Sequence, residues 1–176
     1  MKKSSNFLKK DNKLIYWSLI FLFGSVIGWI YEECFSLIIE KEVVNRGFMF
    51  GPYLPVYGFG ALFLVYFLKK LKKHPLIIFV LSILITGITE YITGYLMESI
   101  FNRTWWDYTG LFMNIKGYVC LRSVLNFAVL ALLLLYLVEP FIEHLSNKYK
   151  NQVVVSCISS YIVVLIDLIT TLLFRY

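Results

Sequence analysis

The chain has 176 residues, of which 59% are hydrophobic and 16% are charged. Its mean hydropathy is +0.72, whereas about a quarter of the residues in an ordinary soluble domain are charged. These values exclude a soluble globular protein and indicate an integral membrane protein. The formal net charge of +6 is explained by basic loops that face anionic lipid, so membrane lipid is an expected partner and nucleic acid is not.

Five apolar segments predict transmembrane helices, since about 20 residues of helix cross about 30 Å of hydrocarbon. In chain order they are 14–39, 54–68, 75–100, 119–138 and 153–174. The second is the shortest, because glycines and prolines between residues 51 and 60 open it with irregular backbone. Transmembrane strands would alternate in blocks of about ten residues, and these segments do not. We therefore expect one all-α membrane domain over residues 14–176, preceded by a basic cytoplasmic segment over residues 1–13.

The distribution of lysine predicts the orientation in the membrane. Lysines gather before the first segment, between the second and the third, and between the fourth and the fifth: Lys2, Lys3, Lys9, Lys10, Lys13, Lys69, Lys70, Lys72, Lys73, Lys148 and Lys150. Positively charged loops stay in the cytoplasm. We expect a multi-pass protein of the bacterial inner (cytoplasmic) membrane with its N-terminus inside and its C-terminus outside.

Four charged side chains lie within the apolar segments, each in the half assigned to the outer leaflet: Glu32, Glu90, Arg122 and Asp167. A charge at this depth costs at least about 2.5–3.5 kcal/mol, so it usually faces a partner, a cavity or a substrate. One interpretation is a structural ion-pair network, such as Arg122 with Glu90. The other is a site for a substrate or for protons, since the carboxylates outnumber the cation.

Helical spacing selects the carboxylates that point inward. Glu32 lies at the margin of a face that contains Gly24 and Gly28, and glycines four residues apart let another helix approach closely. Glu90 lies beside a stripe of Gly87, Tyr91, Gly94 and Glu98, which is too polar to face lipid.

Two predicted outer loops combine arginine with aromatic residues. The first, from Arg46 to Gly60, contains Tyr53 and Tyr57, and the second contains Trp105, Trp106, Asp107 and Tyr108. Irregular backbone at membrane depth is tolerated only where protein buries it or where it lines a wet cavity. The alternative is that these aromatic residues form interfacial anchors.

These observations together predict one outward-facing cavity that both loops cover. Glu32, Glu90 and Asp167 would form its floor, and Arg122 would fix their orientation. Arginines and aromatic rings above an excess of carboxylates favour a neutral or positively charged solute with an apolar body. The expected substrate-binding residues are Glu32, Arg46, Tyr53, Tyr57, Glu90, Trp105, Trp106, Asp107, Tyr108, Arg122 and Asp167.

The sequence predicts neither a metal site nor a cofactor. Cys34, Cys120 and Cys157 are odd in number and unclustered, and His74 and His144 lie in predicted cytoplasmic connections. No zinc spacing or disulfide framework can be built from them. We expect no catalytic residue either, because no nucleophile with an adjacent base lies at membrane depth.

Several motifs resemble one known family. They are Gly28-Trp29-Ile30-Tyr31-Glu32, the run from Asn45 to Gly60, Glu90-Tyr91 with Glu98, Trp106-Asp107-Tyr108, and Asn114 to Gly117. In order and spacing they are similar to the CmpB-like family of type IV ABC-transporter permeases. The resemblance covers roughly residues 20 to 130 and implies a small bacterial inner-membrane permease of several helices. Two positions depart from it, since Tyr118 stands where a basic residue is expected and Asn126 where tryptophan is expected.

Three classes of function remain open. A permease or substrate-binding transporter subunit would need separate ATPase subunits or self-association, because the chain lacks the glycine-rich phosphate loop of an ATPase. An accessory or sensor subunit would carry out no transport of its own. A membrane-embedded enzyme acting on a lipid-linked substrate is disfavoured, since no histidine lies at membrane depth to act as an acid or base. The sequence therefore favours the transporter subunit and predicts that the chain is not an enzyme.

Overall fold

The computed structural model describes residues 2–39, 41 and 47–175, with the side chains of residues 2–12, 39 and 150 left out. The described chain is helical. Its α-helices are α1 (Lys2–Ile39), α2 (Pro55–Leu68), α3 (Pro75–Phe101), α4 (Leu121–Leu133), α5 (Glu139–Lys148) and α6 (Lys150–Phe174). A 3₁₀ turn, η1 (Lys69–Leu71), follows α2, and a π-helix, η2 (Leu134–Val138), joins α4 to α5. The prediction of an all-α membrane fold is confirmed. The predicted basic N-terminal segment is part of α1.

The number of full-length spans is four rather than the five predicted. Within the described residues, the helices long and apolar enough to cross a membrane are Lys13–Ile38, Pro75–Phe101, Leu121–Lys148 and Asn151–Phe174. The second predicted span corresponds to α2, which has 14 residues. At 1.5 Å per residue it is about 21 Å long, against about 30 Å of hydrocarbon. Gly51 and Pro52, which precede Pro55, account for the missing length, since that segment is irregular.

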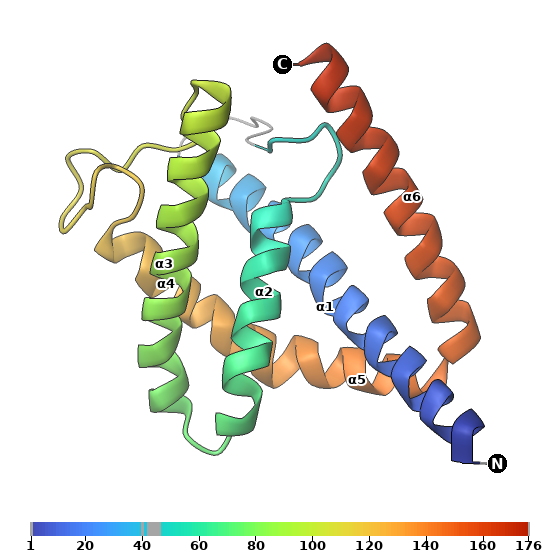
Figure 1. The fold of residues 1–176 in the computed structure, drawn as a ribbon. Coiled ribbons are helices and arrows are strands. Elements are labelled where there is room, and N and C mark those ends of the chain that lie inside the picture. The colour runs from blue at the N-terminus through green and yellow to red at the C-terminus, as the bar shows by residue number, and fades with distance from the viewer. Residues whose placement is uncertain (1, 40, 42–46, 176) are drawn as a thin grey trace.

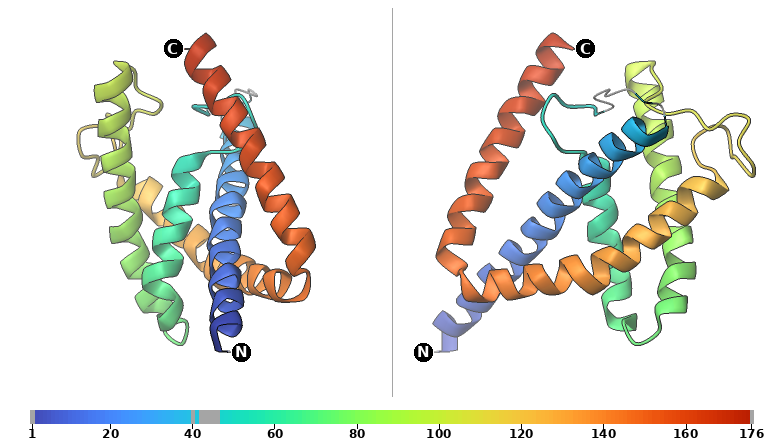
Figure 2. Two further views of the ribbon diagram at one scale, coloured as in Figure 1. Left: turned by 45° about the vertical axis from the view of Figure 1, so that its right-hand side comes forward. Right: turned by 180° about the vertical axis from the view of Figure 1, so that it is seen from behind.

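The helices form a bundle whose connections alternate between two ends (Figure 1). Helices α2 and α3 form an antiparallel hairpin, and α1 crosses beside α2. The continuous α4–η2–α5 helix runs obliquely behind the hairpin, and α6 returns on the far side of α1 (Figure 2). The start of α1, the α2–α3 turn and the α5–α6 connection lie at one end, and the C-terminus lies at the other. The three lysine-rich regions therefore share one end of the bundle, which we predict to be cytoplasmic.

A buried carboxylate that the sequence analysis missed joins the helices at the lysine-rich end of the bundle. The side chain of Glu139, at the start of α5, is 0% exposed, and one of its oxygens lies 2.6 Å from Lys69 Nζ. The same oxygen, Oε1, accepts a 2.5 Å hydrogen bond from the Tyr16 hydroxyl, and the other oxygen, Oε2, pairs with Lys72. The network joins α1, the α2–α3 turn and α5. A π-helix precedes Glu139, and Pro140 after it lacks the amide that a regular helix would use there.

Replacing Glu139 with glutamine is expected to destabilise the protein by about 2 kcal/mol, because a hydrogen bond to a charged group contributes about 1.5–3 kcal/mol and two lysines lose their partner. Thermal unfolding of the purified protein in detergent would measure this loss of stability. Glu143 is the matched control, since it also contacts Lys69, at 3.1 Å, but is 53% exposed. Glu143→Gln should change stability by less than about 1 kcal/mol. Equal effects of the two variants would show that the buried network does not stabilise this end.

Candidate functional site

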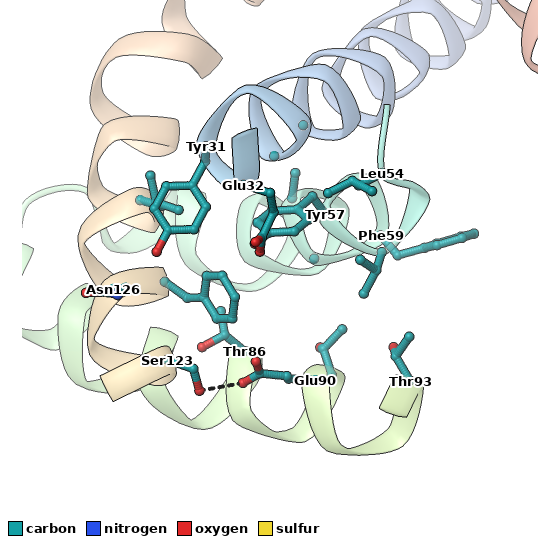
Figure 3. A pocket seen from close by; sticks show the side chains of 18 of the residues that line it. Tyr31, Glu32, Leu54, Tyr57, Phe59, Thr86, Glu90, Thr93, Ser123 and Asn126 are labelled. Carbon is teal, nitrogen blue, oxygen red and sulfur yellow. Dashed lines mark hydrogen bonds between the residues drawn. The ribbon is translucent and has the colours of Figure 1, made fainter. Parts of the chain in front are cut away.

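A cavity of about 710 Å³ lies between α1, α2, α3 and α4 and is bordered by the loop that follows α3. This volume is within the range of small-molecule sites, about 300–1,000 Å³. Figure 3 shows side chains from all four helices turned toward the same space. Among the predicted substrate-binding residues, those that line it are Glu32, Tyr57, Glu90, Trp105, Trp106, Asp107, Tyr108 and Arg122.

Close packing of α1 on α2 brings Glu32 into the cavity. A Cβ added at Gly28 would lie 2.1 Å from the Tyr57 ring, and one added at Gly24 would lie 2.6 Å from the Cβ of Ala61. The absence of side chains at both glycines thus allows the contact. The Tyr57 hydroxyl then donates a hydrogen bond to Glu32. The glycine spacing seen in the sequence is therefore the reason that this pair forms.

Glu90 reaches the cavity from α3 and is only 6% exposed. Its Oε2 accepts a 2.8 Å hydrogen bond from Ser123 Oγ (Figure 3). Ser123 lies in the first turn of α4, where Cys120 and Ser123 form a reciprocal helix cap. Burial raises the pKa of the Tyr108 phenol, and the neighbouring carboxylates of Glu90 and Glu32 raise it further. Tyr108 is therefore a neutral hydrogen-bond donor beside Glu90.

Aromatic rings surround the two carboxylates. The ring of Tyr57 lies 5.5 Å from that of Phe127 and 6.3 Å from that of Tyr31, and Tyr31 and Phe127 are 6.4 Å apart. All three side chains line the cavity. A carboxylate beside aromatic faces is an environment suited to an organic cation.

The loop after α3 is held by its own side chains. Asn102 ends α3 in the left-handed conformation, and Trp106 Nε1 donates to the carbonyl of Tyr118 at 2.8 Å. Asp107 accepts from the amide of Thr109 at 2.8 Å, and hydrogen bonds from Thr109 lower the pKa of this carboxyl. Asp107 thus borders the cavity as an ionised group that already has a partner within its own loop.

Tyr118, one of the two departures from the family's motif, supports the same loop. Its hydroxyl donates to Glu98 of α3, and this bond raises the pKa of the phenol to about 12. The residue therefore ties the loop to the C-terminal end of α3.

Arg122 and Glu90 do not form the ion pair that one interpretation of the sequence suggested. The Arg122 guanidinium lies 5.6 Å from the centre of the Phe35 ring. Among the described side chains, the ion pairs lie at the opposite end of the bundle, around Glu139. The arginine is exposed at the rim of the cavity, because its place in the first turn of α4 directs it away from Glu90, while the next residue, Ser123, faces that carboxylate.

Asp167 was expected on the floor of the cavity, but it lies in α6 and is not part of the cavity lining. Its carboxylate accepts hydrogen bonds from the amide of Gly51 at 2.8 Å and the hydroxyl of Tyr53 at 2.6 Å. It also accepts from the amide of Phe50 at 3.3 Å. Tyr53 therefore contacts Asp167 and is not part of the cavity lining. Burial and the hydrogen bond to Asp167 raise the pKa of the Tyr53 phenol. Arg46 lies outside the described residues.

The residue that follows α6 contacts the same segment. Arg175 Nη1 donates to the carbonyls of Gly47, Phe48 and Met49 at 2.9, 3.1 and 3.3 Å. The held segment places Phe48 in the cavity lining, where its ring lies 5.8 Å from that of Trp105. The two outer segments thus meet at the cavity through Phe48 and Trp105, and α6 supports one of them from behind.

Replacing Asp167 with asparagine is expected to free residues 50–53, because an amide nitrogen would face two backbone donors. Hydrogen exchange measured by mass spectrometry should show faster exchange of the Phe50 and Gly51 amides, by about tenfold for a loss of about 1.4 kcal/mol. Thr170→Val on the same helix is the control, since that hydroxyl bonds only within α6 among the described residues. Unchanged exchange in Asp167→Asn would refute the supporting role.

Several lining residues were absent from the predicted set. Thr86 and Thr93 of α3, and Ser123 and Asn126 of α4, contribute polar groups to the cavity (Figure 3). The sequence did contain a signal for the last two: Ser123 and Asn126 are three residues apart, so they share one face of a helix.

The fold and the cavity define a multi-pass helical membrane protein with an internal site that is large enough for a small molecule. The model of the family described as "Putative ABC-transporter type IV" matches residues 19–172. The chain belongs to this family, which confirms the resemblance seen in its motifs. The family indicates a component of an ABC transporter and association with other transporter components. No curated protein and no solved structure matches the chain.

Proposed function

We propose that this chain is the substrate-binding membrane subunit of an ABC transporter and that the cavity holds the substrate. The observation that carries the proposal is the pair of carboxylates, Glu32 and Glu90, which face one cavity without an ion pair between Glu90 and Arg122. A carboxylate at membrane depth is costly to bury. Proteins retain such groups where they pair with a cation, as Glu139 does, or where they bind a substrate or carry a proton.

The ligand that fits this lining is a small neutral or cationic molecule with an apolar part. Glu32 and Glu90 supply negative charge, Tyr108 and Ser123 supply hydrogen bonds, and the rings of Tyr57 and Phe127 supply apolar surface. An anion would meet two carboxylates in a partly buried site, where like charges repel more strongly than in solution. Loops that follow α1 and α3 border the cavity, so in the predicted orientation it opens to the outside.

Energy from ATP would come from other subunits, because the sequence holds no phosphate-binding loop for ATP. The affinity-tagged chain, solubilised from membranes of its native host in mild detergent, is expected to co-purify an ATPase that contains this loop. Mass spectrometry of the purified complex would identify it. Recovery of the chain with no ATPase, together with solute uptake by liposomes that contain the chain alone, would contradict the ABC subunit and favour a self-sufficient carrier.

A further inference from the structure

The lining of the cavity changes in character with depth. Its outer part contains the polar groups of Glu32, Glu90, Ser123 and Asn126. Its inner part lies between α2 and the α4–η2 helix, and the side chains that line it are apolar: Ala61, Leu64, Leu130, Ala131, Leu134 and Val138. We call this inner part the apolar arm.

The walls of the apolar arm are firmly packed. Ala61, Leu64, Ala131 and Leu134 belong to the buried hydrophobic core that joins α1, α2 and α4. Gly60 also lines the cavity, and a Cβ added there would meet no heavy atom within 4 Å. The core therefore fixes the walls of the arm, and the cavity leaves open space next to Gly60.

The length of the arm matches a hydrocarbon chain. The last polar lining residue of α4 is Asn126, and the apolar lining continues to Val138. The apolar arm begins on α4 at Leu130, and the eight residues of helix from there to Val138 rise about 12 Å, most of the roughly 15 Å of hydrocarbon in one leaflet of a bilayer. A small polar solute between the carboxylates would leave this arm unfilled, and an apolar cavity does not hold water well.

We infer that the ligand of this cavity is a single-chain amphiphile whose alkyl chain lies in the apolar arm and whose neutral or cationic head group lies between Glu32 and Glu90. The inference rests on the proposed substrate site and adds the chemical class of its ligand. The carboxylates and the rings of Tyr57 and Phe127 recognise the head group, and the residues of the arm accept the chain without specific hydrogen bonds.

A series of quaternary ammonium probes tests the inference. The full chain in lipid nanodiscs is titrated with tetramethylammonium and with butyl-, hexyl-, octyl- and decyltrimethylammonium, and binding is expressed against the free aqueous concentration from equilibrium dialysis. Burial of one methylene group is worth about 0.8 kcal/mol, so affinity should rise by roughly fourfold per methylene. Empty nanodiscs give the contribution of lipid partitioning, which is subtracted.

Gly60→Leu is the variant that blocks the arm. It should remove most of the gain with chain length and keep the affinity for tetramethylammonium, which also shows that the variant is folded. Gly60→Ala should cause an intermediate loss. Val129→Leu is the matched control, since Val129 is a lipid-exposed residue of α4 outside the cavity lining, and it should behave as the unmodified protein does.

The outcomes separate this inference from the proposed function. If tetramethylammonium binds but affinity does not change with chain length, the apolar arm is not a binding site and the proposed function stands. If octyl sulfate binds as tightly as octyltrimethylammonium, or if Gly60→Leu retains the full chain-length dependence, the inference is also overturned. If neither tetramethylammonium nor the longer probes bind above the empty-nanodisc level, the proposed cation site itself fails.

Discussion

Replacing Glu90 with glutamine is expected to weaken binding of tetramethylammonium by about a hundredfold and to leave the fold intact. Glutamine keeps the size of the side chain and can still accept the hydrogen bond from Ser123, so only the charge is lost. A unit charge about 5 Å from a cation contributes about 3 kcal/mol at an effective dielectric constant of about 20. This energy corresponds to roughly a hundredfold in affinity. Calorimetric titration of the purified protein with tetramethylammonium would measure the change in affinity.

Glu98→Gln is the matched control for this prediction. Glu98 lies on the same helix and also accepts a hydrogen bond from a hydroxyl, that of Tyr118, but it is not part of the cavity lining. Its variant should bind the cation as the unmodified protein does. If Glu90→Gln instead unfolds while Glu98→Gln remains folded, Glu90 is a structural residue rather than a ligand-binding one.

Replacing Gly28 with alanine is expected to destabilise the protein by about 3 kcal/mol. The new methyl group would lie 2.1 Å from the ring of Tyr57 and 2.4 Å from its Cβ, so α2 must move away from α1. Overpacking of this kind typically costs about 1–3 kcal/mol, and the displacement also breaks the hydrogen bond between Tyr57 and Glu32. Thermal unfolding in detergent and cation titration should both show the loss.

Gly60→Ala separates the effect of the clash from that of removing a glycine. Both glycines lie within helices that line the cavity, but the Cβ at position 60 meets open space. Alanine there should leave stability unchanged or raise it by up to about 1 kcal/mol, the difference in helix propensity. A similar loss of stability in both variants would show that the contact between α1 and α2 at Gly28 is not the cause.

Composition and motifs were sufficient to predict the class of fold and the family. Long apolar runs impose helices in a membrane because backbone polar groups must be satisfied within the segment. The glycine spacing of α1 likewise indicated a close helix neighbour and placed Glu32 beside it. The number of full spans was overestimated, because the apolar run from residue 54 to 68 contains only 14 helical residues.

The lateral arrangement of helices was the part that sequence could not supply. Glu32, Glu90 and Asp167 share a predicted depth, but depth does not tell which helices are neighbours. Helix α6 packs beside α1 and α5 on the far side from α3 (Figure 2), so Asp167 meets the segment before α2 instead of the cavity.

Glu139 was missed for a related reason. It follows an apolar run and precedes a proline, a pattern typical of a solvated helix end. Its burial depends on Tyr16 and Lys69, which lie 123 and 70 residues away along the chain. Contacts over such separations are fixed by tertiary packing and leave no local signal in the sequence.

The most direct test of the central claim is labelling of a cysteine at position 93. Thr93 lines the cavity close to Glu90 (Figure 3), whereas Ile88 of the same helix is exposed on its outer surface. In a background with Cys34, Cys120 and Cys157 replaced by serine, intact cells are treated with a membrane-impermeant maleimide. Thr93→Cys should be labelled from outside, tetramethylammonium should slow the labelling, and Ile88→Cys should stay unlabelled in lipid. If Thr93→Cys is labelled only after the cells are permeabilised, or if the cation has no effect on its rate, the outward-facing cation site is contradicted.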